Sequence, residues 1–99
     1  MKIEKTFNTL TVRDLLQLNA VNSSVFRDET RAALTTQTVL DVDLSQTRMV
    51  DSSGLGALIA LHKTMASRKG HVRILFPTPT VEQVLELTRL HLVFEIVKP

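Results

Sequence analysis

Alternation of apolar and polar residues marks the clearest strand of the chain. Within residues 38–44, leucine and valine alternate with Asp41 and Asp43, the period of two that separates the two faces of a sheet. Four other segments are apolar enough to be strands: residues 2–7, 11–18, 71–76 and 92–97. The pattern therefore predicts a sheet of four to five strands.

A spacing of three to four residues predicts helices between these strands. The longest covers residues 53–68, and Gly70 is predicted to end it as a C-cap. The side of this helix that faces the core is predicted to consist of Leu55, Leu58, Ile59, His62 and Met65. An earlier helix follows the polar segment Asn22-Ser23-Ser24, which offers N-caps.

A third helix is predicted to begin after residue 78. Thr78 is the expected N-cap, and Pro79 suits the first helical position because its missing N–H has no partner there. The inner face of this helix is predicted to be Val81, Val84, Leu85 and Thr88. Helices that bridge apolar strands indicate an α/β fold, a small sandwich built on a largely buried sheet.

Composition limits the classes of function. The chain of 99 residues has a size suited to one domain with one core, and its formal net charge is only +2. The basic residues are scattered, and there is no tyrosine or tryptophan to stack on bases, so direct nucleic-acid binding is not expected. The absence of cysteine, of a signal peptide and of a long apolar run favours a cytoplasmic protein without membrane insertion.

The segment Met49-Val50-Asp51-Ser52-Ser53-Gly54-Leu55-Gly56 carries most of the chemical information. It follows a predicted strand and opens the predicted helix, so its serines can cap free N–H groups, with Ser53 the expected cap. The same serines lie at the positive end of the helix, where a phosphate is tolerated. The segment is therefore either a plain helix start with glycines for a tight turn, or a phosphorylation switch.

Enzyme motifs fail at required positions. A nucleophile elbow needs glycines on both sides of the serine, but Val50 precedes Ser52 where one is required. Gly54-Leu55-Gly56 does not continue as a dinucleotide fingerprint, and His62, His71 and His91 lack metal-ligand spacing. Asp41 and Asp43 are interpreted as loop-side or solvated charges. No catalytic activity, metal site or cofactor is expected.

The segment Asp51-Ser52-Ser53-Gly54-Leu55-Gly56, lying between a strand and a helix, resembles the signature of STAS domains. This family comprises anti-sigma factor antagonists and their relatives. The resemblance covers roughly residues 10–97 and is strongest after residue 38. It implies a STAS-like sandwich over residues 1–99, with a mixed sheet and helices mainly on one face. It also implies that Ser52, directly after the aspartate, is the phosphate acceptor.

The resemblance implies a binding module that is switched by phosphorylation. Unphosphorylated, it would occupy a cytoplasmic anti-sigma factor with serine kinase activity; phosphorylated on Ser52, it would dissociate, and a phosphatase would reset it. An alternative is a STAS subunit that does not cycle phosphate, such as an accessory subunit of a lipid-transport ATPase or a stress-signalling scaffold. Asn22 replaces the family's acidic loop residue and favours the alternative, whereas the intact motif favours the switch. Arg89 replaces a common glycine before the last strand and is expected to alter cap geometry.

The predicted partner surface combines the turn with the outer face of the helix that follows. Residues 57, 60, 63, 64 and 67 are expected to point outward, since other positions are assigned to the core. The small side chains at 57 and 60 would allow close approach of a partner helix. The predicted partner-binding residues are Asn22, Asp51, Ser52, Ser53, Gly54, Ala57, Ala60, Lys63 and Thr64.

Overall fold

The computed structural model describes residues 1–99, whose five strands form one mixed sheet in the order β1-β2-β3-β4-β5. β1 (Lys2–Lys5) pairs antiparallel with β2 (Thr9–Arg13). The remaining strands are parallel to β2 and to one another: β3 (Val39–Asp43), β4 (His71–Leu75) and β5 (Glu95–Val97). The predicted mixed sheet of four to five strands is confirmed.

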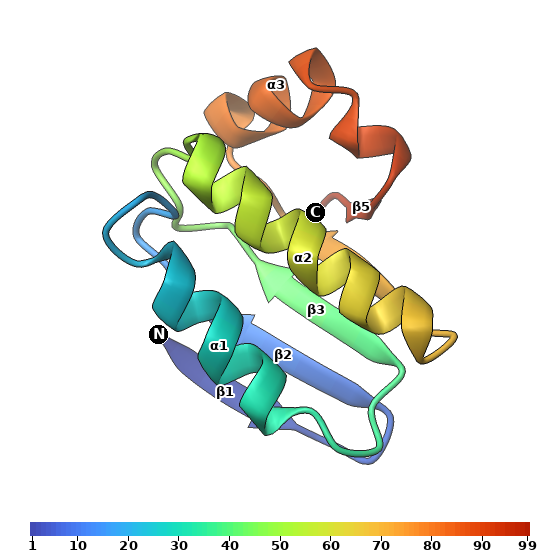
Figure 1. Ribbon diagram of the computed structural model, residues 1–99. Coiled ribbons are helices and arrows are strands. Elements are labelled where there is room, and N and C mark those ends of the chain that lie inside the picture. Colours follow the sequence, from blue (N-terminus) through green and yellow to red (C-terminus); the bar gives the residue numbers. More distant parts are fainter.

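Three α-helices and one short 3₁₀ helix connect the parallel strands. They are α1 (Ser23–Ala33), α2 (Ser52–Ser67), α3 (Pro79–Leu87) and η1 (Leu90–Leu92). Figure 1 shows α1 and α2 side by side in front of the sheet, with α3 near the edge that β5 forms. The α/β class with helices mainly on one face is thus confirmed.

The core lies between the sheet and the helices that cover it. Alternate residues of β2, β3 and β4 are almost completely buried, as period-two strands with one covered face require. This layer consists of Leu10, Val12, Leu40, Val42, Val72 and Ile74. Leu58, Leu61 and Met65 of α2 belong to the same core cluster, which has 18 buried residues in all.

The other face of the sheet is polar, and there the interpretation of Asp41 as a solvated charge is wrong. Asp41 lies directly opposite Arg73 on β4 and is only 5% exposed. The guanidinium donates two hydrogen bonds of 2.7 Å to the two carboxylate oxygens, which is the bidentate geometry of strong ion pairs. This hydrogen bonding to Asp41 raises the pKa of Arg73.

All five strands are shorter than the segments predicted for them, and β2 and β5 differ the most. β2 ends at Arg13, because Asp14 adopts a left-handed φ of 62°. Leu15 and Leu18 are nevertheless buried, so the apolar pattern of 11–18 reflects burial of a loop rather than a strand. At the other end of the chain, residues 90–92 form η1 and only Glu95–Val97 are strand.

The predicted inner face of α2 is partly wrong. Leu58 and Met65 are buried as expected, but Leu55, Ile59 and His62 are only half-buried. Gly54, Ala57 and Leu61 take the inner positions instead. Residues 57–61 are all apolar, so their periodicity does not define which side faces the sheet.

The helix ends follow the prediction in part. Thr78 caps α3 by accepting a hydrogen bond from the N–H of Val81 at 3.4 Å, and Pro79 is the first helical residue. Val81 and Leu85 are buried, whereas Thr88 is exposed, contrary to its predicted place on the inner face. The left-handed residue after α2 is Lys69 and not Gly70.

Glycine is required at position 70 because of a close contact, whereas at position 89 an arginine adopts a backbone conformation that favours glycine. Gly70 is required because a Cβ there would lie 2.3 Å from the carbonyl oxygen of Thr38. Arg89 adopts a left-handed φ of 61°, a conformation that favours glycine. The unusual cap geometry predicted for Arg89 therefore corresponds to a strained left-handed residue before η1.

Candidate functional site

Two loops meet where α2 begins. Residues 16–20, after β2, run beside residues 48–51, after β3. The N–H of Leu18 donates a hydrogen bond of 3.0 Å to the carbonyl oxygen of Met49. The carbonyl oxygen of Leu18 accepts a hydrogen bond of 3.2 Å from the N–H of Asp51. Leu18 and Val50 form a parallel bridge. In α/β sheets this edge, at the carboxyl ends of the parallel strands, is where binding sites form.

Asp51, and not Ser53, caps α2. Its Oδ1 accepts the N–H of Gly54 at 2.9 Å, and its Oδ2 accepts the N–H of Ala20 at 3.1 Å. One carboxylate therefore starts the helix and also binds the neighbouring loop. The prediction that Ser53 is the cap is wrong, because the aspartate one position earlier already fills that role.

Ser52 and Ser53 are the first two residues of α2, and both are exposed. Neither hydroxyl makes a hydrogen bond within the chain. Their backbone N–H groups also lack a partner within the chain, because these are the free donors of a helix start. An exposed hydroxyl thus lies beside two free N–H groups and the positive end of a 16-residue helix.

Gly54 and Gly56 differ in their surroundings. A Cβ at Gly54 would lie 2.2 Å from the carbonyl oxygen of Leu18, so any side chain there would collide with backbone. At Gly56 the Cβ position has no atom within 4 Å, the residue is exposed, and its φ is not positive. The fold requires glycine at 54 but not at 56.

The outer face of α2 contains only part of the predicted set. Ala57 is 5% exposed and lies in the core, so its predicted outward orientation is wrong. Gly54 is buried as well, against the loop at Leu18. Ala60 and Thr64 are half-buried on the side toward α1, where the Arg31 Nε donates to Thr64 Oγ1 at 3.1 Å. The exposed positions are Ser52, Ser53, Gly56, Lys63, Ala66 and Ser67.

Asn22 holds the shape of the loop that precedes α1. Its Oδ1 accepts the N–H of Asn19 at 2.9 Å, and its Nδ2 donates to the carbonyl oxygen of Gln17 at 2.8 Å. An aspartate at position 22 would have no N–H group to donate to the carbonyl oxygen of Gln17. The amide therefore stabilises the loop whose Ala20 N–H binds Asp51.

Exposed apolar residues surround the turn, and they were not predicted from the sequence. Leu16 is 55% exposed and Met49 46%, on the two loops that run side by side. Val21 is 86% exposed just before α1, and Val25 is 54% exposed one turn later. We call these four residues the apolar rim. Exposed apolar groups beside a polar site are typical of protein interfaces.

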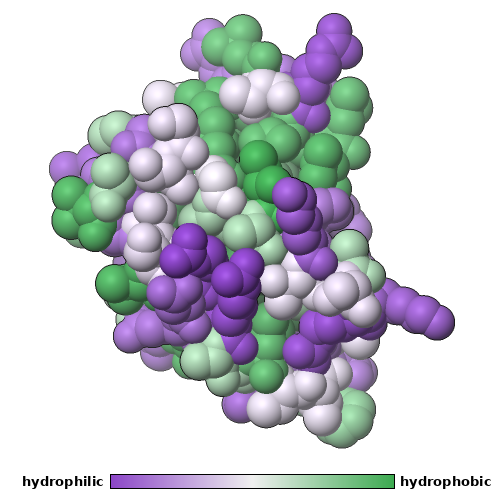
Figure 2. All heavy atoms as spheres, in the orientation of Figure 1, coloured by the Kyte–Doolittle hydropathy of each residue, from purple (hydrophilic) through white to green (hydrophobic).

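A second apolar area adjoins α2 on its other side. Figure 2 shows hydrophobic side chains gathered over the first half of α2 and over the α3–η1 segment. The half-buried members are Leu55 and Ile59, and the exposed ones are Leu87, Leu92 and Val93. His62 of α2 also contacts Phe94, and their ring centroids lie 5.9 Å apart in an edge-to-face arrangement.

No helix combines the length and the apolarity that crossing a membrane would require. No curated protein sequence matches the chain. Among solved structures, the crystal structure of TM1081 from Thermotoga maritima, a proposed anti-sigma factor antagonist, superimposes with a TM-score of 0.91. The sequence identity is 22%, over 99% of this chain and 86% of that chain.

Two structures of SpoIIAA are also similar. The unphosphorylated anti-sigma factor antagonist SpoIIAA gives a TM-score of 0.86 at 21% identity, covering 98% of this chain and 87% of that one. The phosphorylated form of the Bacillus cell fate determinant SpoIIAA gives a TM-score of 0.76 at 20% identity, covering 98% of this chain and 90% of that one. At such identities the similarity establishes the fold.

The family assignment rests on a match along the sequence. The family model described as "Mlab, STAS domain" matches residues 3–97, which is nearly the whole chain. The match includes the capped turn at Asp51 and all five strands but the first residue of β1. The chain therefore belongs to the STAS domain family.

Proposed function

We propose that this protein is an anti-sigma factor antagonist whose release from its partner is controlled by phosphorylation of Ser52. The observation that carries the proposal is the exposed, unbonded hydroxyl of Ser52 at the start of α2. Because Asp51 already caps the helix, Ser52 can be modified without losing a structural hydrogen bond. The proposed role is that of a binding module and not of an enzyme.

The phosphate would be held by groups that are already present. It brings about −1.5 to −2 charges and three acceptor oxygens. The N–H groups of Ser52 and Ser53 lack partners and could donate to it. The helix end would contribute roughly 0.3–1 kcal/mol of stabilisation. The carboxylate of Asp51 is adjacent, so the modified turn would be strongly anionic.

Release follows from charge at a docked surface. A mismatched charge in an interface costs several kcal/mol, and about 1.4 kcal/mol changes affinity tenfold. Phosphorylation is thus expected to weaken binding by roughly a hundredfold or more. The fold need not change, because the phosphate replaces no contact made within the chain.

The proposed partner is a cytoplasmic anti-sigma factor with serine kinase activity, opposed by a phosphatase. We place its contact on the turn, the apolar rim and the exposed positions of α2. Burial of Leu16, Val21 and Met49 would supply apolar contact around the modified serine. At Gly56, where nothing lies within 4 Å of the Cβ position, a partner could approach the helix backbone closely.

Phosphate mapping tests the proposal. The protein is incubated with the anti-sigma kinase of its own organism and ATP, and the modified residue is identified by mass spectrometry. Phosphate on Ser52 is expected. Modification of Ser53 alone, or of Ser23 or Ser24, would contradict the assignment, since the acceptor is defined by its place directly after Asp51.

A second candidate is a STAS subunit that remains bound to a larger assembly, such as a lipid-transport ATPase or a stress-signalling scaffold. Asn22 favours it, because both ends of this amide serve the loop, and the loop therefore offers the turn no carboxylate at this position. A complex of constant affinity with or without kinase treatment would support this candidate. Neighbouring genes for transporter subunits, rather than for a kinase and a phosphatase, would point the same way.

A further inference from the structure

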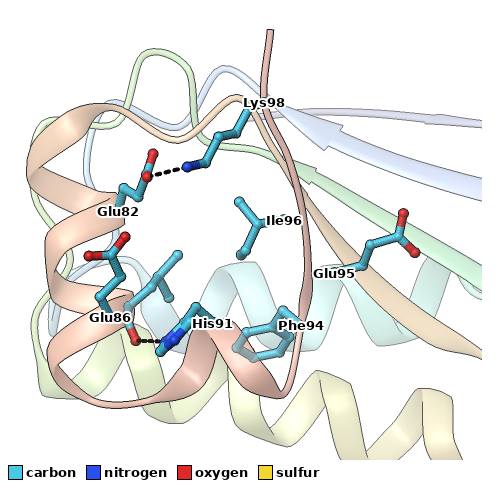
Figure 3. Close-up of a pocket in the computed structure, with 8 residues that line it drawn as sticks. Glu82, Glu86, His91, Phe94, Glu95, Ile96 and Lys98 are labelled. Atoms are coloured by element: carbon cyan, nitrogen blue, oxygen red, sulfur yellow. Dashed lines mark hydrogen bonds and ion pairs between the residues drawn. The ribbon is translucent and has the colours of Figure 1, made fainter.

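A cavity of about 400 Å³ lies between α3 and β5, outside the region described so far. Its volume falls within the range of roughly 300–1,000 Å³ that is usual for small-molecule sites. Leu85, Phe94 and Ile96 line it with apolar surface, and Glu82, Glu86 and Lys98 add charged groups. Figure 3 shows Glu82 and Glu86 reaching into it from α3 and Ile96 from β5, while Glu95 points away.

One amine already occupies part of this space. The Nζ of Lys98 lies 2.8 Å from Oε1 of Glu82. The hydrogen bond to Glu82 raises the pKa of Lys98, and Coulomb attraction from Glu82 and Glu86 adds to it. The site therefore stabilises an ammonium group that belongs to the chain itself.

The charges of the cavity are not balanced by Lys98 alone. Glu82 is paired with Lys98, but the carboxylate of Glu86, one turn further along α3, makes no hydrogen bond or ion pair. Glu95 is a third carboxylate of the lining, but it points away from the cavity (Figure 3), so the two carboxylates and one ammonium that face it leave a net charge of −1. One further monovalent cation would balance it.

We propose that this cavity binds a small organic amine, whose ammonium group pairs with Glu86 and whose apolar body packs on Leu85, Phe94 and Ile96. The apolar lining supplies contact area, and the free carboxylate supplies the charge that orients the ligand. Lys98 then acts as an internal competitor, because its own ammonium group shares the same pair of carboxylates.

The test uses 2-phenylethylammonium as the probe, titrated into ¹⁵N-labelled protein and followed by amide chemical shifts. Two molecules of similar shape serve as controls: neutral 2-phenylethanol and anionic 3-phenylpropanoate. The amine is expected to bind in the millimolar range, at least about tenfold more tightly than the alcohol, with shifts confined to residues 79–98. The anion is expected to show no binding there.

Two variants separate the proposed contacts from general charge effects. Glu86→Gln is expected to weaken binding of the amine at least fivefold and to leave that of the alcohol unchanged. Lys98→Met removes the competitor and is expected to strengthen binding of the amine. Glu29→Gln, at an exposed carboxylate on α1, is the matched control and should change nothing.

Equal affinity for the amine and the alcohol, or shifts centred elsewhere, would overturn the proposal. So would weaker binding by Lys98→Met, since the lysine would then be a contact and not a competitor. The side chains of Glu29, Glu86 and Lys98 are all exposed, and the one ion pair among them, between Lys98 and Glu82, lies at the surface. The variants are therefore expected to fold.

Discussion

Gly54 and Gly56 stand two residues apart in one helix, and the packing of the chain explains only the first. Gly54 faces inward, where its missing Cβ leaves room for the carbonyl group of Leu18. Gly56 faces outward into open space. Asp51 and Ser52 differ in the same way, since Asp51 makes two hydrogen bonds and Ser52 none through its side chain. The inner side of this turn is determined by folding, and the outer side is left available for a partner.

Gly54→Ala is expected to give the largest effect. The new Cβ would meet the backbone of Leu18 at 2.2 Å, so α2 or the loop must shift. Overpacking of this kind costs about 3 kcal/mol of the free energy of unfolding. Urea denaturation of the variant beside the wild type measures it. A loss below about 0.5 kcal/mol would mean that the two loops are not packed as described.

Asp51→Ala removes the cap and the bond to Ala20 together. The expected loss is about 1.5–2 kcal/mol of unfolding free energy. Asp51→Ser is the matched variant, because a serine can cap the N–H of Gly54 but cannot also reach Ala20. It should therefore recover part of the loss. If both variants are equally unstable, the cap contributes little and the loop contact dominates.

Gly56→Ala should act in opposite directions on stability and on binding. Alanine is the better helix former, and its Cβ meets nothing, so unfolding free energy should rise by about 0.5–1 kcal/mol. Affinity for the anti-sigma partner should fall, since the added methyl group stands at the proposed contact. Denaturation and a binding titration on one sample decide it; a stabilised variant with unchanged affinity would remove Gly56 from the interface.

Lys63→Glu reverses a charge on the exposed side of α2, two turns beyond Gly56. Its effect on stability should stay within about 0.5 kcal/mol, because the side chain is exposed. A weaker complex is expected if the partner extends along this face. Lys2→Glu makes the same change of charge at an exposed position of β1, outside the proposed contact, and provides the control for charge alone. Ala60 is less suitable, since it is half-buried beside α1.

The sequence predicts the order of strands and helices because alternation and helical spacing are strong where one face is buried. It does not predict which side of α2 faces the sheet, since residues 57–61 are all apolar. It also places the helix cap at a serine, Ser53, whereas Asp51 is the cap. The approach of the Leu18–Ala20 loop selects Asp51, and a contact between distant segments is invisible in local spacing.

The apolar rim and the cavity near β5 were missed for a related reason. Leu16 falls in a predicted strand and Val25 in a predicted helix, and Val21 and Met49 lie in predicted loops. Only the fold shows that all four are exposed near the same turn. The cavity joins α3 to residues about ten positions later, across η1. The strand predicted over 11–18 runs through Asp14, whose positive φ ends β2 there, although aspartate is a common turn residue.

The central claim is that phosphate on Ser52 controls release without altering the fold. The direct measurement is the dissociation constant for the anti-sigma kinase of the same organism, with unphosphorylated protein, protein phosphorylated on Ser52, and the variants Ser52→Ala and Ser52→Asp. Ser52→Ala should bind like the wild type, and the phosphorylated protein should bind at least about a hundredfold more weakly. Ser52→Asp should lie between them, because it carries about half the charge of a phosphate. Equal dissociation constants for the phosphorylated and unphosphorylated proteins, with circular dichroism unchanged, would contradict the claim.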